Sequence, residues 1–283
     1  MNFFDLHCDT PYECYKKGQE FCENSLAVSG KAGKCFENWK QIFAVWIDDS
    51  LENPFGLYRA VIDDFKRKIA RRPENLTPIM AVEGGAVIGE ELDRFYILKQ
   101  DGIKLLTLTW NGENAIAGGC KTDKGLTQFG KRAINKMNEL KIACDLSHLN
   151  IKSFYSALEQ TDFPIVTHSA CYELCNHIRN LNRGQIRLLA EKGGIMGLAL
   201  YPDFLTGDVF EAVYENIALF CDMGLENQIA IGSDFDGAKM DKRLQNVCNI
   251  PDLYRFLQGK GIEKELLCKI FYENADNFIA KLA

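Results

Sequence analysis

Short apolar runs and longer stretches with helical periodicity alternate along this chain almost to its end. The runs are apolar throughout rather than at every second position, which is typical of strands covered on both faces. We expect eight strands, at residues 3–6, 42–47, 77–82, 102–109, 141–146, 164–167, 194–200 and 228–233. Helical patterns lie between them, for example at 56–71, 128–140, 150–160 and 207–223.

Eight strands that alternate with helices favour a closed (β/α)8 barrel over an open, doubly wound sheet. No strand is followed by the Gly-rich fingerprint of a dinucleotide-binding turn, and the pairs Gly84-Gly85 and Gly118-Gly119 indicate turns. The chain has no internal repeat, low-complexity tract or Pro/Ser-rich linker. The sequence therefore predicts one TIM-type barrel domain over residues 1–283, with its active site at the carboxyl ends of the strands.

Composition narrows the expected partners and compartment. The 33 basic and 39 acidic residues are interspersed and give a net charge of −6, so a nucleic-acid partner is not expected. The chain shows neither a signal-peptide pattern at its amino terminus nor a membrane-length apolar run, and we expect a soluble cytoplasmic protein. The eleven cysteines are scattered without a Cys-x-x-Cys pair, which favours reduced thiols.

Three of the four histidines stand where a predicted strand ends: His7, His148 and His168. Residues two apart on a strand point the same way, so His7 and Asp9 are expected to face the barrel mouth while Cys8 faces outward. Alone, this His-x-Asp pair is better explained by a strand-end histidine beside a turn aspartate. The position of three of the four histidines at strand ends instead suggests a metal site.

Glu83 strengthens the metal hypothesis. It follows the apolar run 79–82, and a carboxylate next to a core strand must be paired or metal-bound. A salt bridge at the barrel rim is one interpretation, and a ligand bridging two cations is the other. His148 and His168, twenty residues apart, are expected on neighbouring strands. Three histidines, one aspartate and one glutamate suffice for two metals that share a carboxylate.

Two further residues suggest how a substrate is handled. Asp234 comes directly off the eighth strand and is expected to carry a proton from metal-bound water to a leaving amine. Asp236, which precedes a glycine, is interpreted as a turn residue. Arg179, in the long loop after the sixth strand, could hold a substrate carboxylate with its planar fork or could be a surface arginine. His177 is expected to play a supporting or structural role.

Six segments occur in a fixed order along nearly the whole chain: His7-Cys8-Asp9, Val82-Glu83-Gly84-Gly85, Asp145-Leu146-Ser147-His148, Thr167-His168-Ser169-Ala170, Arg179-Asn180 and Gly232-Ser233-Asp234-Phe235-Asp236-Gly237. This ordered set resembles the membrane (renal) dipeptidase family of the amidohydrolase superfamily, peptidases with a dinuclear zinc site in a β/α barrel.

The resemblance implies that His7 and Asp9 bind one zinc ion, that His148 and His168 bind the other, and that Glu83 bridges them. It further implies that Arg179 receives the carboxylate of a dipeptide and Asp234 relays the proton. A metal-bridging hydroxide would then attack the peptide bond. The resemblance also implies tolerance of a D-residue at the carboxyl-terminal position, and a homodimer.

One segment departs from the family pattern. Where the family usually has a histidine that contacts the substrate near the scissile carbonyl, this chain has Trp110, within Leu106-Thr107-Leu108-Thr109-Trp110-Asn111. Trp110 keeps one N–H donor but no titratable imidazole. We therefore expect either weaker dipeptidase activity or a substrate with an apolar group at that point. A hydrolase of another amide or cyclic amide, and a catalytically impaired metal-binding homologue, are the alternatives.

Overall fold

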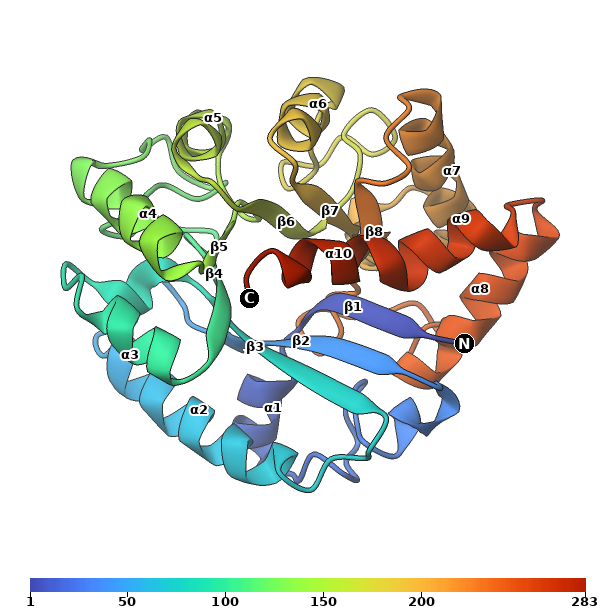
Figure 1. Cartoon of the computed structure of the whole chain (residues 1–283), viewed down its shortest axis with the longest axis horizontal. Helices are drawn as coiled ribbons and strands as arrows, with labels where there is room; N and C mark the ends of the chain where they lie inside the picture. The colour runs from blue at the N-terminus through green and yellow to red at the C-terminus, as the bar shows by residue number, and fades with distance from the viewer.

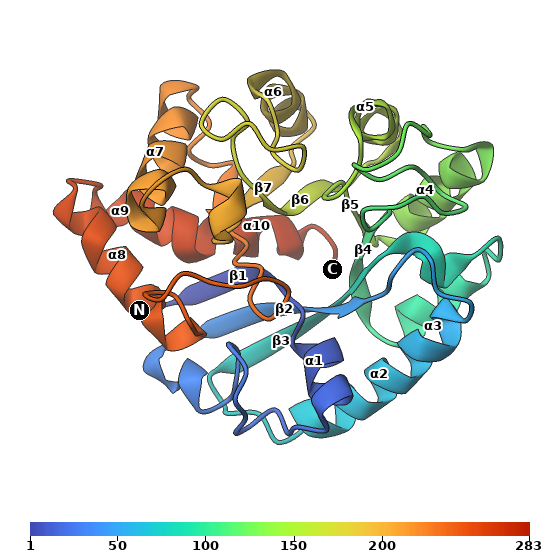
Figure 2. The same ribbon diagram turned by 180° about the vertical axis from the view of Figure 1, so that it is seen from behind.

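The computed structural model describes residues 1–283 and confirms the predicted barrel. Eight parallel strands close into one sheet in the order in which they occur in the chain. The strands are β1 (Phe3–Cys8), β2 (Trp39–Trp46), β3 (Leu76–Glu83), β4 (Ile103–Thr107), β5 (Ala143–Asp145), β6 (Pro164–Ser169), β7 (Ile195–Leu198) and β8 (Ile229–Ile231). Figures 1 and 2 show the helices arranged as a ring around these strands.

The helices follow the strands in the alternation that the sequence pattern predicts. They are α1 (Thr10–Lys17), α2 (Pro54–Ile69), α3 (Arg94–Gln100), α4 (Gln128–Leu140), α5 (Ile151–Gln160), α6 (Arg183–Glu191), α7 (Val209–Asp222), α8 (Ile250–Gly259), α9 (Lys264–Cys268) and α10 (Asn274–Ala280). The predicted helix at 128–140 agrees with α4 at both ends, and the other three differ by at most two residues at either end. Side chains on several loops cap these helices; Asn150, for example, accepts the Ser153 N–H at the start of α5.

Apolar side chains form two clusters on the two faces of the barrel sheet. The larger one fills the space between the strands and the surrounding helices. The smaller one lies inside the barrel and includes Phe4, Leu6 and Ile42. Phe278 and Leu282, from the carboxyl-terminal segment, join this inner cluster, so α10 closes one end of the barrel (Figure 1). Polar residues lie at the opposite end of the barrel, where the strands have their carboxyl ends.

The strands β1 and β6 depart from regular pairing just where site residues begin. The register between β1 and β2 shifts between Asp5 and Cys8, and that between β6 and β7 shifts between Val166 and Ser169. Such bulges re-aim side chains near active sites. Leu6 belongs to the inner cluster, and yet the next residue, His7, also faces inward and contacts β6. Cys8 lies in the outer cluster, as the sequence predicts.

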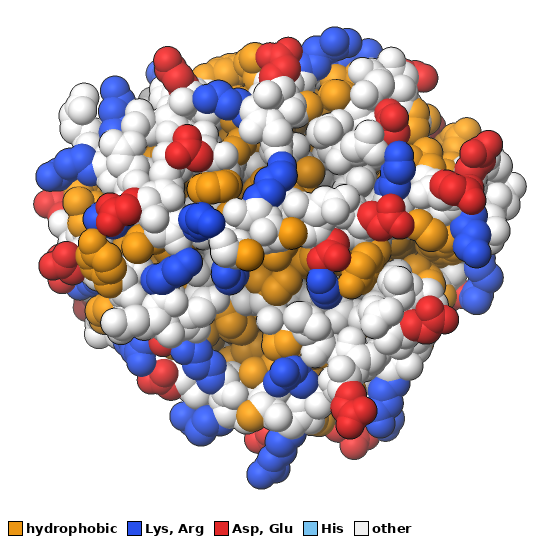
Figure 3. Space-filling model, in the orientation of Figure 1, with side chains coloured by type: hydrophobic (Ala, Val, Ile, Leu, Met, Phe, Trp, Pro, Cys, Tyr) orange, Lys and Arg blue, Asp and Glu red, His pale blue; other side chains and the backbone are white.

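The surface agrees with the interspersed charges of the sequence. Basic and acidic side chains both occur across the face shown in Figure 3. None of the helices combines the length and the apolar character that crossing a membrane requires.

Candidate metal and substrate site

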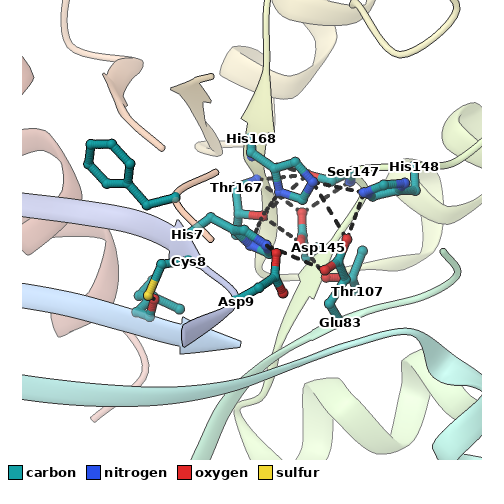
Figure 4. A network of polar contacts seen from close by, with 12 residues as sticks. His7, Cys8, Asp9, Glu83, Thr107, Asp145, Ser147, His148, Thr167 and His168 are labelled. Atoms are coloured by element: carbon teal, nitrogen blue, oxygen red, sulfur yellow. Dashed lines mark hydrogen bonds and ion pairs between the residues drawn. The ribbon is translucent and has the colours of Figure 1, made fainter. Parts of the chain in front are cut away.

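The five predicted metal ligands come together at the carboxyl ends of the strands (Figure 4). His7 lies near the end of β1, and Asp9 follows it at the start of the next loop. Glu83 is the last residue of β3, and His168 lies near the end of β6. His148 lies three residues beyond β5 and has a positive φ of 68°. All five are almost fully buried.

The carboxylate of Glu83 divides these residues into two groups. Its Oε2 lies 3.5 Å from Nε2 of His7, which is in turn 3.6 Å from Oδ2 of Asp9. Its Oε1 lies 2.7 Å from Nε2 of His148 and 3.7 Å from Nε2 of His168. Both groups, His7–Asp9–Glu83 and Glu83–His148–His168, are compact enough to hold a metal ion. Glu83 is the residue that the two groups share.

Two buried atoms in this cluster have no hydrogen-bond partner in the protein, namely His7 Nε2 and Asp9 Oδ1. Unpaired buried polar atoms are costly and need a partner that the chain itself does not provide. Imidazole nitrogen and carboxylate oxygen are the donors that zinc and similar divalent ions accept. The residues present therefore fit a pair of divalent cations.

The electrostatics of the metal-free cluster point the same way. Burial would lower the pKa of His7, but the carboxylates of Asp9 and Glu83 outweigh burial and raise it well above its ordinary value. Burial, helped by the charge of Arg179, lowers the pKa of His148 to about 4. Burial also places the pKa of His168 well below its ordinary value. His148 and His168 are thus neutral at pH 7 and can offer a lone pair to a cation.

Hydrogen bonds behind the histidines leave Nε2 available in each ring. Nδ1 of His148 lies 2.9 Å from Oδ1 of Asn111, and Nδ1 of His168 lies 2.9 Å from Oγ1 of Thr167. A ring whose Nδ1–H is donated to an oxygen exposes its Nε2 lone pair to a metal. The sequence interpretation did not identify Asn111 or Thr167, because neither residue type is a usual zinc ligand.

Two buried aspartates below the cluster were also missed. Asp5 accepts hydrogen bonds from the Ser233 hydroxyl at 2.6 Å and from the Ser233 N–H at 2.7 Å, which ties β1 to β8. Burial raises the pKa of Asp5. Asp145 accepts hydrogen bonds from Thr107 and Thr167 and so ties β5 to both neighbouring strands. A signal was present, since each aspartate interrupts an apolar strand.

A cavity of about 660 Å³ opens above the cluster and is lined by Asp9, Glu83, His148 and His168. Asp234 also lines it and lies close enough to His7 and His168 to form a third potential metal-binding group. Burial raises the pKa of the Asp234 carboxyl to about 7. This side chain can therefore take up and release a proton near neutral pH.

Arg179 enters the same cavity from the β6–α6 loop and is almost fully buried. One of its terminal nitrogens donates to the His168 carbonyl at 3.1 Å, its guanidinium lies 5.3 Å from the centre of the Phe204 ring, and its Nε has no partner. It forms no ion pair within the protein. A buried cation without a counter-ion favours an anionic ligand. The surface interpretation of Arg179 is therefore wrong.

Trp110 lines the cavity wall together with Trp46 and Tyr12. The Trp46 and Trp110 rings meet edge to face with centroids 5.1 Å apart, and Tyr12 packs on Trp46 at 5.0 Å. The backbone N–H of Trp110 donates to Asp49 at 3.0 Å, which fixes the start of the loop after β4. The site thus has an apolar wall where the sequence comparison with the family predicts an imidazole.

The supporting residues behave as the sequence indicates, with one addition. Nδ1 of His177 accepts the backbone N–H of Arg179 at 3.2 Å, which is a supporting contact. Asp236 has a φ of 67°, as a turn residue does. Its carboxylate also accepts the Thr10 hydroxyl at 2.6 Å and the Ala27 N–H at 2.7 Å, so this turn anchors the long β1–β2 connection.

A β/α barrel with imidazoles and carboxylates gathered at its strand ends defines the class of amidohydrolase-like metal-dependent enzymes. The family model of the membrane dipeptidases, peptidase family M19, matches residues 57–280, and the chain belongs to this family. It is therefore a metal-dependent dipeptidase.

Individual relatives and solved structures resemble this chain over most of its length. A Klebsiella pneumoniae protein of the pqqA 5′ region is 29% identical over 223 residues, which are 72% of this chain and 81% of that protein. The structure of dipeptidase AC, a family M19 metallopeptidase, superposes with a TM-score of 0.85 at 23% identity, over 99% of this chain and 98% of that one. A Rhodobacter sphaeroides metallopeptidase holding a phosphinate mimic of L-Ala-D-Ala gives a TM-score of 0.85 at 22% identity, over 100% of this chain and 99% of that one.

Proposed function

We propose that this chain is a dinuclear zinc dipeptidase, with His7 and Asp9 at one ion, His148 and His168 at the other, and Glu83 bridging. The observation that carries the proposal is the Glu83 carboxylate, whose two oxygens face the two histidine groups separately. Two bound zinc ions would supply Lewis-acid polarisation of the scissile carbonyl and an acidified bridging water that provides the attacking hydroxide. Family membership supports the metal, and the donor set supports zinc.

The remaining residues would bind and orient the dipeptide. Arg179 pairs with the terminal carboxylate, which fixes the register of the substrate in the cavity. Asp234 accepts a proton and delivers it to the departing amine, a transfer for which a pKa near 7 is suited. Trp110 contacts the substrate near the carbonyl through its indole N–H, which has no partner inside the protein, or through its ring face. A residue of D configuration at the carboxyl-terminal position is accepted, a proposal supported by the L-Ala-D-Ala mimic in the Rhodobacter sphaeroides relative.

We further propose that the protein works in a reducing compartment such as the cytoplasm. The support is the cysteine chemistry, because all eleven thiols are free and several are buried in the core. A homodimer is proposed from the family resemblance alone, and sedimentation of the purified chain tests it.

The decisive experiment combines metal analysis with a substrate panel. We expect two zinc ions per chain, cleavage of L-Ala-L-Ala and L-Ala-D-Ala, and loss of activity on chelation that zinc restores. The carboxyl-terminal amides of the same dipeptides should be poor substrates because they cannot pair with Arg179. Activity that survives complete metal removal would exclude this mechanism.

A matched pair of variants separates the dipeptidase from a hydrolase of lactams or cyclic imides. Arg179→Ala should lower kcat/KM for dipeptides by about 10- to 100-fold, the range expected for a lost charged contact. Arg187→Ala, which removes an exposed arginine on α6, should leave kcat/KM unchanged. Efficient cleavage of a cyclic imide that is insensitive to Arg179→Ala would favour the other hydrolase.

A further inference from the structure

The hydroxyl of Thr167 lies at the centre of the buried network beneath the proposed metal ligands (Figure 4). Its Oγ1 is 2.7 Å from Oδ2 of Asp145, 2.9 Å from Nδ1 of His168 and 3.3 Å from Nδ1 of His7. The two histidines belong to different metal groups, one on each side of Glu83. Thr167 is therefore in contact with both halves of the site through a single atom.

The surroundings of Asp145 determine which way the Thr167 hydrogen points. Oδ2 of Asp145 faces the hydroxyls of Thr107 and Thr167, and its Oδ1 accepts the backbone N–H groups of Ser147 and Thr167. With donors on every side, the carboxylate acts only as an acceptor. The single hydrogen of the Thr167 hydroxyl is thus donated to Asp145.

The lone-pair side of Oγ1 then faces the two histidine rings, with the Ser147 hydroxyl 3.3 Å away. An oxygen that has already donated its hydrogen can only accept from Nδ1, so both rings must carry hydrogen at Nδ1. Nε2 of His7 then faces Asp9 and Glu83, and Nε2 of His168 faces Glu83 and lies 2.8 Å from Nε2 of His148. This is the tautomer that each ring needs in order to bind a cation.

The barrel is shaped to hold the Thr167 backbone in this position. Thr167 lies in the irregular stretch of β6, and its carbonyl oxygen presses toward the two following strands. A Cβ atom placed on Gly197 or Gly232 would lie 2.0 or 1.8 Å from that oxygen. Only glycine fits at both positions, because the bulged backbone of Thr167 occupies the space that a side chain needs.

We infer that Thr167, oriented by Asp145, is a positioning residue that sets the metal-binding tautomer of one histidine in each half of the site. This inference rests on the proposed dinuclear function, and it assigns to one hydroxyl a role at both ions. His148 is positioned separately, by Asn111. Loss of the Thr167 contact and loss of the Asn111 contact should therefore affect the two metal ions differently.

Zinc binding to the chelator-stripped, full-length protein tests the inference, with competition against a chromophoric chelator as the readout. Thr167→Val removes the hydroxyl at nearly constant volume and should lower the affinity for both zinc ions by about 10- to 100-fold, the cost usual for lost partners of metal ligands. Thr167→Ser keeps the hydroxyl and should bind both ions nearly as the natural protein does. Asn111→Ala should lower the affinity for only one of the two ions.

Two controls separate positioning from general damage to the fold. Thr161→Val removes another buried threonine hydroxyl, one that accepts the Phe163 N–H away from the site, and should leave both zinc affinities unchanged. In nitrogen-15 NMR spectra of the zinc-saturated protein, the imidazole region should contain signals from only four histidines. His7 and His168 should show slowly exchanging Nδ1–H protons in the natural protein and in Thr167→Ser, and fast exchange in Thr167→Val.

Each outcome has a clear meaning. Equal zinc affinity of the natural protein and a folded Thr167→Val would overturn the positioning role while leaving the proposed function intact. Weaker binding of only one zinc ion in Thr167→Val would overturn the claim that the hydroxyl serves both halves of the site. A natural protein that binds no zinc would overturn both the inference and the proposed function.

Discussion

Nε2 of His148 lies 2.7 Å from Oε1 of Glu83, which is the shortest contact between a histidine and a carboxylate in the site. The other oxygen of Glu83 is directed to His7, 3.5 Å away. The two oxygens of one carboxylate thus serve two different sets of ligands. A substitution that makes these two oxygens chemically different should therefore impair metal binding even where the shape of the site is kept.

Glu83→Gln makes them unequal, because an amide nitrogen cannot ligate a cation. We expect the variant to retain less than two zinc ions per chain and to lose activity by about 100-fold or more. Elemental analysis and dipeptide turnover measure both quantities. Glu91→Gln changes an exposed carboxylate and should match the natural protein. Two tightly bound ions in Glu83→Gln would show that Glu83 does not bridge.

Gly237 packs directly on two carboxylates of the site. A Cβ at this position would lie 2.1 Å from Oδ2 of Asp9 and 2.6 Å from Oδ1 of Asp234. Gly237→Ala should therefore displace both side chains and lower zinc affinity and turnover by at least about tenfold, because metal sites tolerate little displacement. Gly259→Ala meets no atom within 4 Å and should leave both unchanged. Wild-type zinc affinity in Gly237→Ala would contradict this packing.

Trp110 makes the pocket of this chain differ from the family pattern. If the only loss is a donor near the carbonyl, Trp110→His should raise kcat by about tenfold or more, since oxyanion donors contribute factors of this order. Trp110→Phe keeps a ring against Trp46 but supplies no donor, and its kcat should not rise. Steady-state kinetics on one dipeptide measure all three proteins. Unchanged kinetics in the histidine variant would show that the pocket stabilises the transition state differently.

Asp234 should make the stability of the metal-free protein depend on pH. Burial raises the pKa of this carboxyl to about 7 from an ordinary value of 3.8. Between these values the folded chain binds a proton that the unfolded chain releases. The free energy of unfolding therefore falls as pH rises through this window, by up to about 1.4 kcal/mol per unit, and this contribution is lost above pH 7.

Urea unfolding in the presence of chelator measures this contribution. Asp234→Asn lacks the titrating group, so the variant should gain stability relative to the natural protein as pH rises from 4 to 7. The two curves should run parallel above pH 7. Parallel curves over the whole range would mean that Asp234 is not perturbed in the metal-free fold.

Much of the barrel and of the candidate site could be predicted from local sequence alone. Apolar runs bounded by polar residues mark each strand, because a barrel strand is buried on both faces. Strand ends in a parallel barrel all open at one mouth, so His7, Glu83 and His168 had to converge once the barrel was recognised. The positions of the proposed ligands along the chain therefore indicate the site without knowledge of the tertiary structure.

The tertiary structure alone decided how those residues are supported. The contacts of Thr167 with Asp145 and His7, and of Asn111 with His148, join residues far apart in the chain. The contact between Thr167 and His7 lies where β1 and β6 shift register, which alternation along one strand does not predict. The sequence determines which ligands reach the barrel mouth, because strand direction is a local property. The tautomers of these ligands and the shape of the cavity follow from packing between strands, which is not a local property.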